Sequence, residues 1–252
     1  MYGAVPATVC TGLLSGQLYH DHSDMIKEIQ TYLQNVKQQM PGMKMKLLPL
    51  QNHSKSLSRS STNRSCCDGK KHTPKEYLTN YLKLNVDDYV DVVSYLQQPY
   101  WQQVEYEVPD NWWHNKDYYN IPLDDFMKVL KNAVKNGYTL AIGGDVSEPG
   151  YDSWTKCAIV PTFDIPSEYI DENSRQFRFS NETTTDDHGI HVIGYEELDG
   201  KTWFLIKDSG AGSRNTGDKG YYFYHEDYVK LKIMDFMVHK DMFKDYFSKF
   251  NK

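Results

Sequence analysis

The chain has 252 residues, of which 39% are hydrophobic and 25% are charged, and its formal net charge is −6. This length and composition predict a globular protein with a sizeable core, and the acidic balance argues against a nucleic-acid partner, which requires a basic surface. No run reaches the roughly 18 to 20 apolar residues of a membrane helix, and residues 1–14 lack the pattern of a signal peptide, so we expect no membrane partner.

The first half of the sequence predicts helices. Ser23 can cap a helix whose apolar residues recur at three- and four-residue spacing until Pro41-Gly42. Residues 51–72 are rich in Ser, Lys and Arg, which predicts an exposed loop rather than a functional basic patch. A capping box with Pro in the first helical position, Thr73-Pro74-Lys75-Glu76, then begins another helix.

The second half changes character after a polar, aromatic connector near residue 105. We expect a helical subdomain over residues 1–105 and a β-rich subdomain over residues 106–252. A helix over residues 122–136 should end at Gly137. The expected strands cover residues 138–142, 157–160, 188–195, 201–207, 220–224 and 233–238.

Four cysteines, at positions 10, 66, 67 and 157, are too few and too irregularly spaced for a disulfide framework. We expect Cys10 and Cys157 to be buried and the other two to be exposed. No cofactor is indicated.

Two strands joined at Asp199-Gly200 carry the residues best suited to catalysis. A His and a carboxylate at the same end of adjacent strands form a base and its orienting group. A two-residue turn would put Asp208 opposite His191, whereas an odd-length loop centred on Leu198 would put Asp208 opposite His188. The two histidines lie three apart on a strand and point to opposite faces, so we expect no metal site here.

Several motifs together resemble one peptidase family. They are "YGAVPATVCTGL", "HTPKEYL", "EVPDNWW", "DDHGIHVIGY", "KDSG", "GYYFY" and "MDFMVHKD". These are similar to papain-like cysteine peptidases of the bleomycin hydrolase and bacterial aminopeptidase C branch. The resemblance covers nearly the whole chain except residues 47–70.

The resemblance implies an α+β papain-like fold, with a partial helical subdomain followed by an antiparallel, β-barrel-like subdomain. By position, His188 matches the catalytic His and Asp208 occupies the place of its Asn partner. The resemblance therefore favours His188 and the odd-length loop. It also implies a peptide substrate, a homo-oligomer and a cytoplasmic location.

Three departures from the family pattern bear on activity. The family's nucleophilic Cys lies in a "GTCW" segment that precedes its "YGAVP" stretch, so we expect the nucleophile to be absent from this sequence and to belong to a Cys-bearing N-terminal segment. Asp208 replaces Asn, and a carboxylate can still accept the imidazole N–H. Gly210 stands where the family has a Trp that shields the pair from water.

These features support two hypotheses. The first is the C-terminal part of a cysteine aminopeptidase, and the second is a non-catalytic homologue that binds peptides or a partner chain through the remaining cleft. A third, weaker hypothesis uses Cys157 or Cys10 as the nucleophile of a Cys–His–Asp triad.

Overall fold

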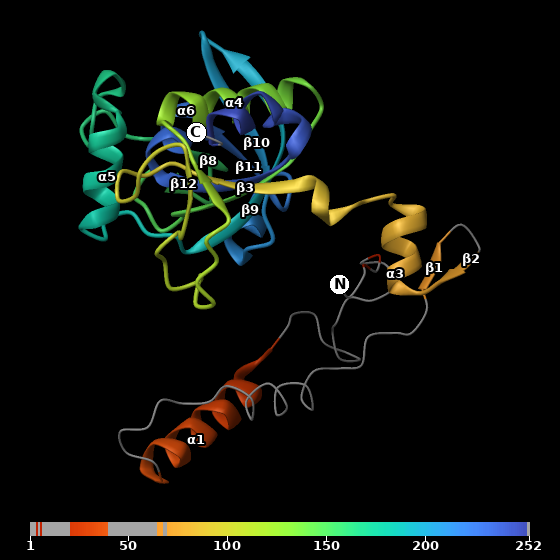
Figure 1. Cartoon of the computed structure of the whole chain (residues 1–252). Helices are drawn as coiled ribbons and strands as arrows, with labels where there is room; N and C mark the ends of the chain where they lie inside the picture. The colour runs from red at the N-terminus through yellow and green to blue at the C-terminus, as the bar shows by residue number, and fades with distance from the viewer. Residues whose placement is uncertain (1–3, 5, 7–20, 40–64, 68–69, 251–252) are drawn as a thin grey trace. The chain divides into compact units, whose positions relative to one another are not determined.

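The computed structural model describes residues 4, 6, 21–39, 65–67 and 70–250. The chain forms two compact units, Met1–Asn85 and Val86–Lys252 (Figure 1). No helix among the described residues is long and apolar enough to cross a membrane.

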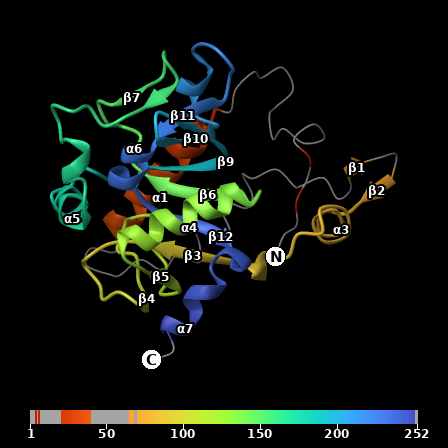
Figure 2. The ribbon, with the colours of Figure 1, turned by 90° about the horizontal axis from the view of Figure 1, so that it is seen from above.

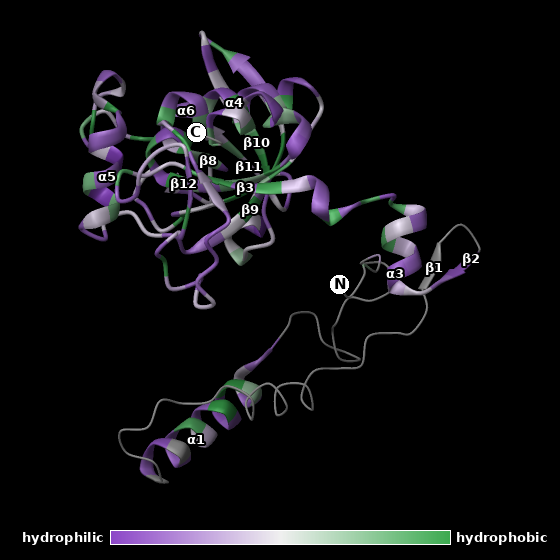
Figure 3. Cartoon of the chain, in the orientation of Figure 1, coloured by the Kyte–Doolittle hydropathy of each residue, from purple (hydrophilic) through white to green (hydrophobic). Residues whose placement is uncertain are grey.

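The first unit contains the predicted helix α1 (Ser23–Gln39). Ser23, which the sequence suggested as the cap, is the first residue of this helix, and its backbone N–H donates to Oδ1 of Asp21 at 2.9 Å. Figure 3 shows hydrophobic and hydrophilic residues alternating around α1, as the three- and four-residue spacing predicts. Part of the expected loop 51–72 is instead paired, because β1 (Ser65–Cys67) and β2 (Lys70–His72) form a small antiparallel pair.

The predicted capping box begins the next helix of this unit. The N–H of Glu76 donates to Oγ1 of Thr73 at 3.2 Å, and the N–H of Thr73 donates to Oε2 of Glu76 at 2.8 Å. Helix α3 (Pro74–Glu76) continues directly into a π-helical turn, η1 (Tyr77–Tyr81). The element is therefore mostly π-helical rather than the regular α-helix expected from the sequence.

One ten-stranded sheet forms the centre of the second unit, in the order β4-β5-β3-β12-β6-β9-β10-β11-β8-β7. Its strands are β3 (Tyr89–Val93), β4 (Gln102–Val104), β5 (Tyr118–Asn120), β6 (Leu140–Gly144), β7 (Tyr151–Asp152), β8 (Cys157–Ala158), β9 (His188–Leu198), β10 (Lys201–Lys207), β11 (Tyr221–His225) and β12 (Ile233–His239). Neighbours are antiparallel except β3 with β5 and β8 with β11. All six predicted strands are present.

The division between the units differs from the boundary expected at residue 105. Strands β3 and β4 precede that position, yet β3 pairs with β12 and β4 pairs with β5. Backbone hydrogen bonding therefore joins residues 89–104 to the β-rich unit.

Helix α4 (Leu123–Lys135) packs on β6 and β9 of this sheet (Figure 2). It begins after Pro122 and ends before Gly137, whose φ of +79° suits a glycine at a helix end. The sheet unit also contains α5 (Glu172–Ser180), α6 (Glu226–Lys232) and α7 (Phe247–Phe250). Short 3₁₀ turns lie at η2 (Val86–Asp88), η3 (Ser167–Tyr169), η4 (Ala211–Arg214), η5 (Lys240–Met242) and η6 (Lys244–Tyr246).

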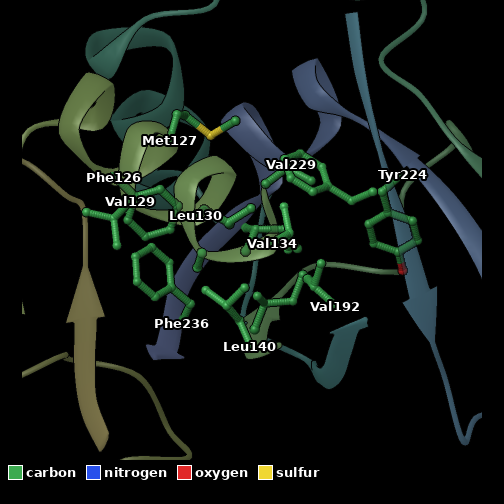
Figure 4. Close-up of a cluster of buried hydrophobic side chains, with 14 of the residues drawn as sticks. Phe126, Met127, Val129, Leu130, Val134, Leu140, Val192, Tyr224, Val229 and Phe236 are labelled. Carbon is green, nitrogen blue, oxygen red and sulfur yellow. The ribbon is translucent and has the colours of Figure 1, made fainter. Parts of the chain in front are cut away.

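The main hydrophobic core lies between α4, α6 and the sheet (Figure 4). Phe126, Leu130 and Val134 occupy one face of α4 and meet side chains of the sheet such as Val192 and Phe236. This core holds β6, β9 and β12 together. Strand β9 begins at His188, the histidine that the sequence indicates as catalytic.

Buried Arg175 ties α5 to the sheet. It is 1% exposed, and its guanidinium donates to the carbonyl oxygens of Ser94 at 3.0 Å, Lys230 at 2.8 Å and Met234 at 3.2 Å. These bonds satisfy the buried cation with backbone carbonyl oxygens.

Candidate active site

The turn between β9 and β10 is the two-residue turn at Asp199-Gly200, not the odd-length loop centred on Leu198. Asp199 and Gly200 have φ values of +52° and +75°, and Leu198 pairs directly with Lys201. Two consecutive positive φ values are typical of the hairpin turn that Asp-Gly favours. The odd-length loop expected from the family resemblance is therefore wrong.

A bulge further along the hairpin changes its register. Leu205 pairs with Gly194, but Ile206 pairs with Val192, so one residue of β9 is left over between them. Side chains alternate between the two faces of a strand. Skipping one residue of β9 therefore changes which face of β9 lies level with the following residues of β10. Asp208 therefore comes level with Ile190 rather than His191, and Ile190 shares its face of β9 with His188.

The structure brings His188 and Asp208 together by this route. Nε2 of His188 lies 2.8 Å from Oδ1 of Asp208. The side chain of Asp208 is 2% exposed, whereas that of His188 is 27% exposed. An ionised carboxylate only accepts, so Nε2 carries the proton and Nδ1 is left available to a reacting group.

Two further donors hold the carboxylate. The backbone N–H of Gly210 donates to Oδ1 at 2.8 Å, and the hydroxyl of Tyr151 donates to Oδ2 at 3.3 Å. Burial alone would raise the pKa of Asp208, but the hydrogen bonds from His188, Gly210 and Tyr151 hold that pKa below its usual value. Asp208 therefore stays ionised and can stabilise a charged imidazole.

The loop after β10 closes around Asp208. The backbone N–H of Asp208 donates to the carbonyl of Gly220 at 2.8 Å, and Oγ of Ser213 donates to the carbonyl of Asp208 at 3.1 Å. The N–H of Gly220 in turn donates to the carbonyl of Ser213 at 2.8 Å. The backbone on both sides of Asp208 is thus fixed.

Gly210 replaces the family's Trp at a crowded position. A Cβ there would lie 3.2 Å from both Oδ1 and Oδ2 of Asp208. The absence of a side chain lets the Gly210 N–H approach the carboxylate, so the Asp and Gly departures from the family pattern fit each other.

A pair of carboxyl groups lies beside Gly143 of β6, which pairs with Gly189 of β9. Asp235 of β12 pairs with Gly143 of β6, and the empty side-chain position of Gly143 faces both Oδ1 of Asp235 and Oδ1 of Asp186. Burial raises the pKa of Asp186 to about 6. Burial and the neighbouring Asp186 raise the pKa of Asp235 well above its usual value.

His191 does not join the dyad. It is exposed on the opposite face of β9 and pairs with Lys207 across the hairpin. Partial burial and the Lys207 charge lower its pKa. Among the described residues, no group of His, Cys, Asp and Glu side chains is arranged to hold a metal ion.

Cys157 is a poor nucleophile where it stands. It is half-buried at the start of β8, and its Sγ donates to the carbonyl of Thr155 at 3.6 Å. Burial and the nearby Asp152 raise its pKa, so the thiol stays protonated. Cys10 and the side chains of Cys66 and Cys67 lie outside what the structure describes.

Comparison with known proteins identifies the family. The model of the Peptidase C1-like family matches residues 22–252. This chain belongs to that family. No curated protein sequence matches it.

One solved structure agrees with the papain-like α+β fold of this family member. The chain is similar to PepW from Lactobacillus rhamnosis HN001 (DR20), with a TM-score of 0.56 and 16% identity. That match covers 74% of this chain and 44% of the PepW chain, so the described protein spans less than half of that structure. A match to the SERA5 proenzyme from Plasmodium falciparum, with a TM-score of 0.26 and 14% identity over 46% of this chain and 27% of that chain, is too low to indicate a shared fold.

Tyr151 and the Gly210 N–H are partners of Asp208 that the sequence did not predict. Tyr151 lies on β7, a two-residue strand at the sheet edge, and no apolar alternation marks such a short element. The Gly210 contact is made by the backbone, which every residue type except Pro provides.

Proposed function

We propose that this chain is the His-bearing part of a papain-like cysteine aminopeptidase that hydrolyses peptide bonds. The observation that carries the proposal is the 2.8 Å contact between Nε2 of partly exposed His188 and the buried carboxylate of Asp208. Membership of the Peptidase C1-like family supports the reaction class. Cleavage from the amino end follows from the resemblance to the aminopeptidase C branch.

In the proposed reaction, a thiolate attacks the carbonyl carbon of the scissile bond while His188 is an imidazolium. A carbon–sulfur bond forms, the carbon–nitrogen bond breaks, and Nδ1 of His188 gives its proton to the leaving amine. Water then attacks the thioester carbon and gives a proton to Nδ1. The carbon–sulfur bond breaks, and the thiolate and the imidazolium are restored.

Asp208 positions the imidazole throughout this cycle. It accepts the Nε2 proton, so Nδ1 is the nitrogen that exchanges protons with the substrate and water. Its lowered pKa keeps the negative charge in place when His188 is charged. A carboxylate in the position of the family's Asn thus serves the same geometric purpose and adds electrostatic stabilisation of the imidazolium.

The nucleophile in this proposal is a thiolate on a Cys-bearing N-terminal segment rather than one of the four cysteines of this sequence. The raised pKa of Cys157 supports this assignment, because a protonated thiol is not the reactive form. A homo-oligomer, a cytoplasmic location and a peptide substrate belong to the same proposal and rest on the resemblance.

Treatment with an epoxysuccinyl thiol inhibitor followed by intact-mass analysis tests the assignment of the nucleophile. We expect the purified chain to form no stoichiometric adduct. An adduct that disappears in a His188→Ala variant would show that one of the present cysteines is activated, and the proposed origin of the thiolate would be wrong.

Adding the family's Cys-bearing segment in trans tests the proposed reaction. We expect peptide hydrolysis with the wild-type chain and none with His188→Ala, and the inhibitor should then modify only the added segment. Asp208→Asn should retain part of the activity, because an amide oxygen can still accept the Nε2 proton.

A non-catalytic peptide-binding homologue is the second candidate. The observation that favours it is Gly210, which leaves the dyad without the family's covering Trp, together with the 27% exposure of the His188 side chain. Peptide binding without hydrolysis, even when the Cys-bearing segment is present and folded against the chain, would favour this candidate over the peptidase.

A further inference from the structure

A cavity of about 500 Å³ lies on the face of the sheet opposite the core. His188 is not among its lining residues, but the hydrogen-bond partner of His188, Asp208, and its chain neighbour, Gly189, both line the cavity. Neither the hydrolytic steps proposed above nor the fold requires this cavity, so its lining side chains are free to serve a separate binding role.

One row of side chains across four adjacent strands forms the floor of this cavity. Ala141 of β6 pairs with His191 of β9, His191 pairs with Lys207 of β10, and Lys207 pairs with Tyr221 of β11. Directly paired residues project to the same face of a sheet. The small side chain of Ala141 and the absent one of Gly189 leave the space, since a Cβ on Gly189 would meet no atom within 4 Å.

The loop that holds Asp208 supplies two more cations. Arg214 ends the 3₁₀ turn η4, Lys219 precedes Gly220, and both line the cavity. The hydrogen bonds of Ser213 and Gly220 that fix the backbone of Asp208 also fix this part of the loop. The dyad and these cations are therefore positioned by the same short stretch of backbone.

The cavity is strongly positive in a chain whose net charge is −6. Lys207, Arg214 and Lys219 line it, and its one acidic side chain is Asp208, which is 2% exposed and already engaged by His188. Among the described residues, none of these three cations takes part in an ion pair. The pKa of His191 is lowered first by its partial burial and then by the charge of Lys207, which is consistent with a positive environment.

We propose that this cavity binds a carboxylate of the peptide that occupies the active site. The ligand class rests on the proposed function, since it assumes that a peptide at His188 extends past Gly189 to the face of the sheet on which the cavity lies. Arg214 provides a planar pair of donors suited to a carboxylate, while Lys207 and Lys219 add charge on either side. The carboxylate is either an Asp or Glu side chain of the peptide or its C-terminal group.

Isothermal titration calorimetry with the purified chain and short acetylated peptides tests this proposal and separates the two sources. Ac-Ala-Ala-Ala-Glu amide is compared with its Gln counterpart, and Ac-Ala-Ala-Ala-Ala with a free C-terminus is compared with its amide. We expect at least one carboxylate peptide to bind about fivefold or more tightly than its neutral counterpart, with an advantage that shrinks as the salt concentration rises. The pair that shows the advantage identifies the source.

Variants of two lining residues test whether the advantage of the carboxylate peptide arises in this cavity. Arg214→Gln and Lys207→Gln should each remove most of the advantage of the carboxylate peptide. Lys128→Gln, a matched change of an exposed lysine on α4, should leave the advantage unchanged. Circular dichroism confirms that each variant is folded before titration.

Equal affinity for charged and neutral peptides would overturn the carboxylate site, as would an advantage that survives in both cavity variants. These outcomes are separate from a failure of the proposed reaction, because the titration requires no nucleophile. A chain that binds the carboxylate peptide normally but never hydrolyses peptides with an added Cys-bearing segment would retain this site and lose the peptidase function.

Discussion

Gly210 and Asp208 are in contact through both the backbone and the empty side-chain position of the glycine. The Gly210 N–H donates to Oδ1 at 2.8 Å, and a Cβ on Gly210 would lie 3.2 Å from each carboxylate oxygen. The same Oδ1 accepts the Nε2 proton of His188, so a displacement of the carboxylate would also move the imidazole or break this hydrogen bond.

Replacement of Gly210 should therefore disturb the dyad. We expect Gly210→Ala to lower the free energy of unfolding by about 1 to 2 kcal/mol, because the added methyl group crowds a buried carboxylate. Chemical denaturation measures the change. Gly189→Ala is the matched control, since its Cβ enters open space, and an equal loss in both variants would contradict the crowding argument.

Asp208 should contribute to stability in a pH-dependent way. Its pKa in the folded chain lies below the usual 3.8, so the folded state binds fewer protons than the unfolded state as the pH falls. The contribution is therefore complete above the unfolded pKa and is lost as the pH falls through the lower, folded pKa. We expect the stability difference between wild type and Asp208→Asn to be constant above about pH 5 and to shrink as the pH falls from there through 3.8 towards about pH 2. A difference that stays constant over that interval would refute it.

Asp186 should show the opposite pH dependence. Burial raises its pKa to about 6, so the folded state binds more protons than the unfolded state between the usual value of 3.8 and that pH. The stabilisation is present below the unfolded pKa and is lost as the pH rises through about 6. Asp186→Asn should raise the melting temperature at pH 8, by the equivalent of about 1 kcal/mol, and have little effect at pH 4. The exposed control Asp218→Asn should have no such effect at either pH.

Lys232 and Glu148 form a buried ion pair whose disruption should be costly. Lys232 is 2% exposed, and its Nζ contacts Oε1 of Glu148 and lies 3.1 Å from Oγ1 of Thr184. We expect Lys232→Met to reduce the free energy of unfolding by about 3 to 5 kcal/mol, because it leaves a carboxylate with little water and no cation. The double variant Lys232→Met, Glu148→Gln should recover part of the loss in urea denaturation. No recovery would show that the packing of Lys232, rather than its charge, is what matters.

Elements with a local sequence signal could be predicted from the sequence. Regular apolar spacing identified α1 and α4, and the capping box at Thr73 identified the start of α3. By contrast, α6 follows β11 without a break, and its cap is Nδ1 of His225, which accepts the N–H of Asp227 at 3.2 Å. Histidine is not among the usual capping residues, so the sequence gives no sign of where this strand ends and the helix begins.

The dyad could be predicted only in part. The motifs pointed to His188 and Asp208, but the loop length inferred from them was wrong, because a β-bulge rather than an odd-length turn corrects the register. A bulge that leaves one residue between Gly194 and Val192 has no local signature in a run of apolar residues and glycine. The partners of Asp208 depend on how distant segments fold together, and one sequence does not reveal those contacts.

The closed loop after β10 also determines how the site comes apart. The amide protons of Asp208 and Gly220 are both held by hydrogen bonds within that loop, and the hydroxyl of Ser213 bridges the same stretch. Breaking them releases the loop as a cooperative unit, so hydrogen exchange at these two amides should report one shared opening free energy. A single local opening would separate the carboxylate from its imidazole and displace Arg214 and Lys219 at the same time, so the dyad and these two cations should be lost together.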